Sequence, residues 1–315
     1  MYKFILILLL FLLAKPIESD AWGFYAHRKI NNLAVYTLPP ELFGFYKAHI
    51  NEITKKATAA DERRGVLKNE APKHYLDADH YEHSCPLDTI PQDWNDAVSV
   101  FTEDTLKSYG IVPWNIEFVM FNLIQAFKEK DVEKIVRLSA DLGHYVGDAH
   151  VPLHCTENYN GQLTGQKGIH ALWESRLPEL FDTAYDFFVG RAYYMESPSL
   201  FIWESINESF AAKDTVLFME KALSDSFPES KKYTFVKKGT TLKKEYSEEF
   251  SALYHKSLGD MVERRMRKSI LTVGCLWYTA WVDAGSPELP YELALPTKEE
   301  EEELVIPEHD HIERK

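Results

Sequence analysis

Hydrophobic residues recur at intervals of three and four along most of the chain, and this spacing predicts α-helices. The segment 115–128, with the sequence NIEFVMFNLIQAFK, shows the period most clearly. Alternation of apolar and polar residues, which is typical of strands, is scarce. We therefore expect a single all-α domain, with helices at 24–38, 41–55, 115–128, 132–148, 169–187, 201–224 and 248–283.

Polar segments separate these helices. The segments 81–93 and 157–168 lack helical periodicity and are predicted as loops. Gly285, Ser286 and Pro287 end the last helix, because glycine and proline favour helix termination. The aromatic residues near that end, Trp277, Tyr278 and Trp281, are predicted to pack in the core, as is Trp173.

The first residues have the pattern of a secretory signal peptide. A charged start is followed by an apolar run over residues 4–14 and by small residues at Ser19 and Ala21. The run is too short for a permanent membrane span. We expect cleavage after Ala21, which makes residues 1–21 a signal peptide, leaves Trp22 as the mature N-terminus and sends the protein to the periplasm or outside the cell.

Charge and composition narrow the class further. The 315 residues carry a formal charge of −14, which argues against a broad basic surface for duplex nucleic acid. Half of that net charge lies in residues 284–315, which contain ten acidic and three basic residues. We therefore expect a domain at 22–283 followed by an acidic, flexible tail. With Cys85, Cys155 and Cys275, an exported protein can form one disulfide, and all three pairings remain open.

Histidines and carboxylates recur together within 31 residues. His144 and Asp148 are four residues apart on one predicted helix, so their side chains share a face. His170 and Glu174 repeat that spacing, and His154 lies between the two pairs. Imidazole nitrogen and carboxylate oxygen are ligands that suit zinc. The segment therefore predicts a metal site.

Upstream residues complete a pattern that resembles a known superfamily. Asp61, His74 and the spacing from Trp22 to His27 precede the two pairs in the order found in the zinc-dependent superfamily of the fungal S-one/P-one single-strand nucleases and the bacterial zinc phospholipases C. The resemblance covers most of the mature chain to about residue 180. It implies a mostly helical fold that holds three zinc ions.

The resemblance also implies which residue holds which ion. Asp148 would bridge two of them. Carried over by position, the first ligand set is Asp61, His74, His144 and Asp148, the second is Trp22, His27 and Asp148, and the third is His154, His170 and Glu174.

Such a centre would be locally cationic inside an acidic protein, which suits a phosphodiester. A water between two zinc ions loses a proton near neutral pH and would attack phosphorus in line. We therefore expect Asp61 and Asp148 to serve catalysis, and the resemblance places Arg64 against the phosphate. In the nucleases an aromatic residue stacks on the base and an aspartate binds its edge, which would give Tyr75 and Asp77 these roles.

The substrate markers conflict. Trp22, His27 and the Asp61 to Arg64 spacing are similar to the nucleases, so we expect cleavage of single-stranded DNA or RNA. Glu174 as the last ligand, and the short loop between His154 and His170, are similar to the phospholipases C, which leaves phospholipid head groups as the alternative substrate. Another phosphate ester and a non-catalytic exported zinc-binding protein also remain open. We expect no stable membrane insertion, and the sequence implies no protein partner.

Overall fold

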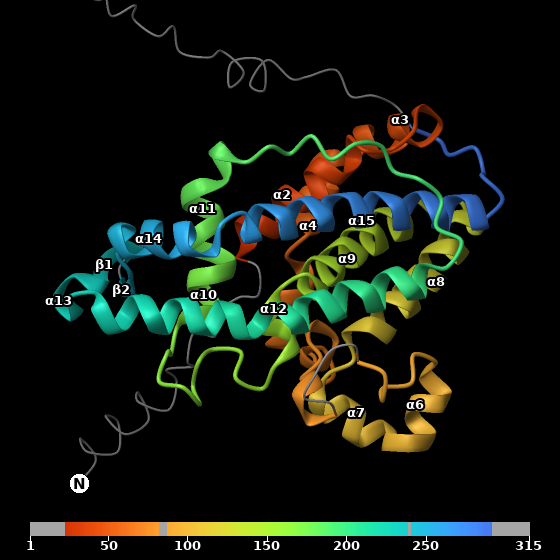
Figure 1. Ribbon diagram of the computed structural model, residues 1–315. Coiled ribbons are helices and arrows are strands. Elements are labelled where there is room, and N and C mark those ends of the chain that lie inside the picture. The colour runs from red at the N-terminus through yellow and green to blue at the C-terminus, as the bar shows by residue number, and fades with distance from the viewer. Residues whose placement is uncertain (1–22, 82–86, 239–240, 292–315) are drawn as a thin grey trace, which may run out of the picture.

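The structure, a computed structural model, describes residues 23–81, 87–238 and 241–291, and within them the chain is mostly helical, as its hydrophobic period predicts (Figure 1). The elements of its first half are α2 (Phe24–Val35), α3 (Pro40–Ala48), α4 (Ile50–Lys56), α5 (Ala59–Arg64), η1 (Ala71–His74), η2 (Ala78–His80), α6 (Trp94–Phe101), α7 (Glu103–Tyr109), α8 (Val112–Glu129) and α9 (Val132–Ala149). Those of its second half are η3 (Pro152–Cys155), α10 (Ile169–Ala171), the π-helical η4 (Leu172–Arg176), α11 (Leu177–Phe181), η5 (Asp182–Ala184), α12 (Pro198–Ser226), α13 (Glu229–Lys232), β1 (Tyr233–Lys238), β2 (Thr241–Tyr246), α14 (Glu248–Leu258) and α15 (Met261–Asp283).

Helix α9 lies at the centre of the molecule, between α12 and α15 (Figure 1). All of its residues from 138 to 149 are buried, so it faces protein on every side. The indole of Trp277 on α15 donates to the carbonyl of Ser139 at 3.0 Å and stacks on Tyr46 at 4.7 Å between centroids. The predicted core role of Trp277 is confirmed. Polar side chains on the second half of α9 therefore need partners in the interior.

Two of the predicted helices are each divided in two. In 41–55, His49 ends α3 with φ −105° and ψ 11°, and α4 begins at the next residue. In 248–283, Gly259 adopts φ +63°, which only glycine tolerates easily, and separates α14 from α15. Hydrophobic spacing continues across both breaks, so the pattern along the chain did not reveal them.

The helix predicted for 169–187 ends early, at Phe181. It consists of α10, a π-helical turn and α11, and the chain leaves the helix after η5. The carboxylate of Asp182 accepts hydrogen bonds from Tyr25 and Lys29 of α2, each at 2.5 Å, and so ties this end to the first helix. The interaction joins residues more than 150 positions apart, so it cannot be predicted from the hydrophobic spacing within one segment.

The hairpin β1–β2 was not predicted. Its strands are antiparallel, with Tyr233 opposite Tyr246 and Phe235 opposite Lys244. The segment is rich in lysine and short in apolar residues, so it gave little strand signal. Helices α6 and α7 were also missed, whereas the loop predicted at 157–168 is confirmed by turns and the absence of helix and strand there.

The ends of the chain are described only in part. The predicted signal peptide, the predicted ligand Trp22 and residues 292–315 lie outside the described residues. Two residues of the segment predicted as a tail contact the helical body: the carbonyl of Pro287 accepts from the indole of Trp281 at 3.0 Å, and Leu289 packs against the core. None of the helices described here combines the length and the apolar character that crossing a bilayer requires.

Candidate metal centre

Eight of the nine predicted ligands lie within the described residues, and all eight are buried. Helix α2 supplies one of them, α5 and η1 one each, α9 two, η3 one, and α10 and η4 one each. In chain order they are His27, Asp61, His74, His144, Asp148, His154, His170 and Glu174. Ligand atoms within 4.8 Å of one another form three groups: His27, Asp61 and His144; His74, His144 and Asp148; and His154, His170 and Glu174.

The tightest convergence joins four side chains around Nδ1 of His74. This nitrogen lies 2.9 Å from Oδ2 of Asp148, 3.1 Å from Nε2 of His144 and 3.6 Å from Oδ1 of Asp61. Nε2 of His144 lies 3.3 Å from Asp148 and 3.7 Å from Asp61. Ligands about 2.0–2.2 Å from a tetrahedral ion are about 3.3–3.6 Å apart, so these spacings of 2.9 to 3.7 Å are close to those around one small metal ion.

The two carboxylate oxygens of Asp148 face different partners. Oδ2 faces His74 and His144, whereas Oδ1 lies 3.4 Å from Nε2 of His27 and 3.6 Å from Nδ1 of His154. The imidazole rings of His27 and His144 stack at 3.8 Å between centroids. One carboxylate is thus placed between two pairs of imidazole rings.

The third group lies next to the first two. Oε2 of Glu174 is 3.1 Å from Nε2 of His170 and 3.4 Å from Nε2 of His154. The sequence spacing was interpreted as one α-helical face, but the backbone from Leu172 to Arg176 is π-helical. The wider π turn still leaves His170 and Glu174 in contact, and such turns occur often at functional sites.

Backbone carbonyls fix two of the rings. Nδ1 of His144 donates to the carbonyl of Ala57 at 2.8 Å, and Nδ1 of His154 donates to the carbonyl of His74 at 2.7 Å. In each ring this hydrogen bond fixes Nδ1 as the donor and directs Nε2 at a carboxylate, that of Asp148 for His144 and that of Glu174 for His154. A second hydrogen bond of this kind is the usual support of a metal-binding histidine.

The protonation states also suit metal binding. Burial lowers the pKa of His27 to about 3 and that of His74 to about 4, so both rings are neutral at pH 7. Burial opposes the charged form of Asp148 too, but His144 and His154 hold the pKa of this carboxyl well below its usual range. Burial opposes the charged form of His144 and His154, but Asp148 raises the pKa of His144 to about 9 and that of His154 above its usual range. These two rings would therefore release a proton when a cation binds.

Two buried ring nitrogens support metal binding at this centre. Nε2 of His27 and Nε2 of His170 are buried and make no hydrogen bond of ordinary geometry among the described residues. Buried polar atoms are otherwise satisfied in proteins. Three buried carboxylates and five buried imidazoles therefore form groups that can hold metal ions.

A hydrogen-bonded cluster of charged side chains, which was not predicted from the sequence, holds the elements that carry two of these ligands. The Arg63 guanidinium donates to Asp141 at 3.1 Å and to Glu70 at 3.2 Å, and Tyr145 also donates to Glu70. Lys73 donates to the same carboxylate at 2.8 Å. The cluster binds α5 and η1, which carry Asp61 and His74, to the central helix. In the sequence, the adjacent Arg63 and Arg64 of α5 were the one feature that pointed to this cluster.

The predicted catalytic and substrate-binding residues lie around the same centre. Nη1 of Arg64 is 3.5 Å from Oδ1 of Asp61, and about a quarter of its side chain is exposed. Tyr75 directly follows His74, is half-buried and has an extended backbone. Burial, then Asp79 and Glu157, raises the pKa of Asp77 to about 7. The neighbouring carboxylate of Asp79 already accepts a hydrogen bond, from the hydroxyl of Thr156 at 2.7 Å.

Cys155 and Cys275 are both buried and free, and Cys85 lies outside the described residues.

No protein-family model matches the chain, and a search of curated proteins finds no match either.

Proposed function

We propose that this chain is a zinc-dependent phosphodiester hydrolase that cleaves single-stranded DNA or RNA. The observation that carries the proposal is the convergence of eight buried histidines and carboxylates in three groups, with Asp148 between two of them. The order of these residues along the chain, which resembles the S-one/P-one nucleases, supports the same conclusion.

The residues of the centre would act by position and charge. When bound, three zinc ions would supply concentrated positive charge and an activated water near neutral pH. Asp148 and Asp61 would hold these ions close together. The backbone hydrogen bonds of His144 and His154 keep their rings oriented, so little reorganisation would be needed when a substrate arrives.

Among the cations of the described residues, Arg64 is best placed for the phosphate. Its guanidinium is partly exposed and adjoins Asp61, whereas Arg63 is committed to the carboxylates of Glu70 and Asp141. A planar guanidinium binds two phosphate oxygens at once. Arg64 would therefore orient the phosphodiester and stabilise charge on its oxygens during cleavage.

Tyr75 and Asp77 would bind a base next to the phosphate. The segment that holds them is fixed on both sides, since the amide of Leu76 donates to the carbonyl of His154 at 2.9 Å and that of Asp77 to Tyr109 at 2.7 Å. A ring held in this way provides a stacking surface. The Asp77 carboxylate makes no hydrogen bond with another described residue and is available to the edge of a base.

Phospholipid head groups are the second candidate substrate. Glu174 supports this alternative, because it occupies a ligand position where the phospholipases C that this chain resembles have glutamate. The short loop between His154 and His170 supports it too. Both substrates are phosphodiesters, so the same metal centre and Arg64 would serve either one.

The experiment that separates them offers both substrates to one preparation. Protein purified with Trp22 as its first residue would be given single-stranded DNA and phosphatidylcholine in parallel, with and without chelator. The proposal expects DNA cleavage that chelation abolishes. Cleavage of lipid alone would assign the site to a phospholipase C, and no chelator-sensitive hydrolysis of either would refute the proposal.

Tyr75→Ala provides the residue-level test. The variant should keep all bound metal, because Tyr75 is not a ligand, and should change the preference among bases. Tyr194→Ala, which removes an exposed ring on the segment before α12, is the matched control. Unchanged base preference in Tyr75→Ala would remove the role assigned to this ring.

A further inference from the structure

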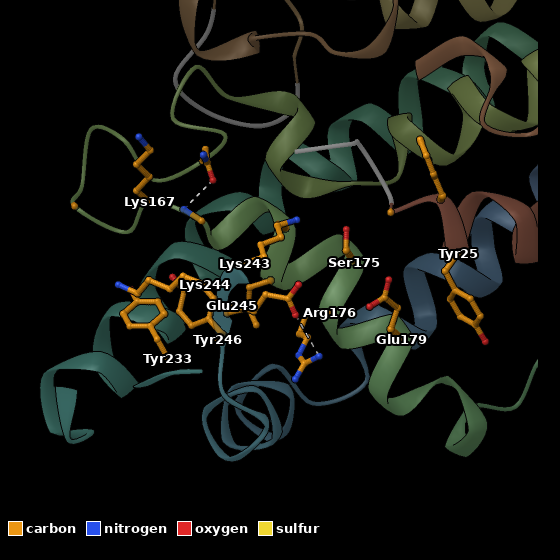
Figure 2. Close-up of a pocket in the computed structure, with 17 residues that line it drawn as sticks. Tyr25, Lys167, Ser175, Arg176, Glu179, Tyr233, Lys243, Lys244, Glu245 and Tyr246 are labelled. Atoms are coloured by element: carbon orange, nitrogen blue, oxygen red, sulfur yellow. Dashed lines mark hydrogen bonds and ion pairs between the residues drawn. The ribbon is translucent and has the colours of Figure 1, made fainter. Parts of the chain in front are cut away.

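A pocket outside the metal centre lies between the unpredicted hairpin and the helix that carries His170. Its cavity is about 680 Å³, which is within the range of sites for small ligands. Figure 2 shows Tyr233, Lys244 and Tyr246 on its hairpin side and Ser175 and Glu179 on its helical side. The loop 157–168 contributes a third wall through Asn160 and Lys167, among others.

The pocket is positively charged although the protein is acidic. Arg176 and Glu245 line it as an ion pair at 3.5 Å, and their charges cancel. Lys167, Lys243 and Lys244 remain against one further carboxylate, that of Glu179. Among the described residues, no carboxylate pairs with any of these three lysines. The Nζ of Lys244 lies 3.6 Å from the ring centroid of Tyr233, so cation and aromatic surface adjoin each other.

A buried carboxylate holds two of the walls in place. Glu220 on α12 is fully buried and accepts from Gln166 of the loop at 2.6 Å. It also lies 3.0 Å from Nζ of Lys232, the residue before β1, and 3.5 Å from the hydroxyl of Tyr246 on β2. Loop and hairpin are thus bound to one point of α12. The backbone that carries the basic side chains is therefore held in place before a ligand binds. Binding then costs little conformational entropy for ordering that backbone.

The pocket is continuous in sequence and space with the third metal-binding group. Ala171 and Ser175 line the pocket, and they directly follow His170 and Glu174 on the same short helical stretch. Tyr159 packs its ring against His170 at 5.4 Å between centroids, and the next residue lines the pocket. A chain-like ligand held at the metal centre would reach the lysines by passing over this stretch.

We propose that the pocket binds the phosphates of the nucleic-acid strand that extends beyond the cleaved linkage. The inference rests on the proposed nuclease function and deepens it. Three ammonium groups that no described carboxylate pairs with, one of them over the ring of Tyr233, match the repeating phosphates and bases of a single strand. A strand is favoured over a lipid surface because these cations line a concave pocket, whereas a membrane contacts a protruding surface.

The test measures binding to the zinc-loaded protein without cleavage. The probe is a labelled, nuclease-resistant phosphorothioate dodecamer, followed by fluorescence anisotropy over a range of salt concentrations. Each phosphate contact to a single strand contributes about 0.7 to the slope of log affinity against log salt. Lys243→Gln with Lys244→Gln should therefore lower the slope by about 1.4 and weaken binding about tenfold at low salt.

The matched control is Lys55→Gln with Lys128→Gln, which removes the same charge from exposed positions on α4 and α8. It should leave slope and affinity near those of the original protein. Equal slopes for the original protein and for the hairpin variant would overturn the inference. So would loss of binding to vesicles of phosphatidylglycerol with unchanged dodecamer binding, which would instead assign the lysines to a membrane.

The result of this binding test can be distinguished from the result of the hydrolysis test of the proposed function. A slope that falls in the hairpin variant of a protein without DNA hydrolysis would uphold the pocket and refute the nuclease. Chelator-sensitive DNA cleavage with an unchanged slope would uphold the nuclease and refute the pocket.

Discussion

Nδ1 of His74 lies 2.9 Å from Oδ2 of Asp148, although 74 residues separate the two along the chain. This contact joins a short 3₁₀ turn to the buried end of the central helix. The carboxylate also faces His27, His144 and His154, so four ring systems from four elements depend on its position. Asp148 is therefore the side chain through which the proposed metal ions and the fold are most strongly linked.

Substitution of Asp148 by asparagine should release most of the bound metal. The amide keeps the size of the side chain but loses the charge and one of the two ligating oxygens. Metal content after dialysis, measured by plasma mass spectrometry, checks this expectation. Glu133→Gln is the control, because Glu133 lies on the same helix, in its exposed first turn. A fully loaded Asp148→Asn protein would contradict the bridging role.

Glu174→Gln should release metal only from the third group. Glu174 contacts His154 and His170, whereas the ligands around Asp148 keep all their carboxylates. We expect partial metal loss, smaller than that of Asp148→Asn, and the same metal analysis measures it. Glu179→Gln, one to two turns further on and exposed, should stay fully loaded. Equal losses in the two glutamate variants would argue against a separate third site.

An N-terminal extension should remove most of the activity. The superfamily resemblance assigns the mature amine of Trp22 as a ligand, and this amine exists only after cleavage at Ala21. A form that retains an extra methionine would be compared with the cleaved form for metal content and DNA hydrolysis. Full activity in a form whose extension has been verified by mass spectrometry would exclude the amine as a ligand.

Gly143→Ala should destabilise the junction of α2 with α9. A Cβ at this position would lie 1.9 Å from Oδ1 of Asn31, whose amide donates to the carbonyl of Ala140 at 3.0 Å. We expect a loss of about 1–3 kcal/mol in the free energy of unfolding from overpacking, which exceeds the helix-propensity gain of about 1 kcal/mol.

Urea denaturation measures that loss, and a second substitution identifies its cause. Asn31→Ala in the Gly143→Ala background removes the clashing oxygen, so part of the stability should return. If the double variant is no more stable than Gly143→Ala, the contact with Asn31 is not the source of the loss.

Glu70 should make stability depend on pH in the acid range. Burial opposes its charge, but hydrogen bonds from Lys73 and Tyr145 and the charge of Arg63 lower its pKa to about 2. A carboxyl with a lowered pKa contributes stability above its unfolded pKa of about 4.5, and this contribution is lost as the pH falls towards 2. The shift corresponds to a contribution on the order of 3 kcal/mol.

Glu70→Gln measures this contribution. The difference in free energy of unfolding between the original protein and the variant should be largest near pH 6 and should shrink between about pH 4.5 and 2. Glu129→Gln, at an exposed position, should show no such trend. A difference that stays constant across this range would show that the carboxylate charge does not contribute.

The sequence predicted much of the centre because its ligands fall in short, chemically distinct patterns. His144 with Asp148, and His170 with Glu174, are each four residues apart, and helical geometry alone brings such pairs together. The contact of Asp61 and His74 with this group depended on the family resemblance. Nothing local in the sequence reports that α5 and η1 pack on α9.

Other features had no signal at the level of hydrophobic spacing. The breaks at His49 and Gly259 interrupt the backbone without interrupting the apolar pattern. The hairpin is held by Glu220, which lies before it in the chain and binds Lys232 and Tyr246 after folding. Such contacts form between elements, so they follow from the packed structure and not from any one segment.

The measurement that tests the central claim most directly is the metal content of the chain purified with Trp22 at its N-terminus. Plasma mass spectrometry should find about three zinc ions per chain, and chelation should remove them together with hydrolysis of single-stranded DNA. A folded protein that contains no stoichiometric metal, or that cleaves phosphodiesters equally well in chelator, would contradict the account.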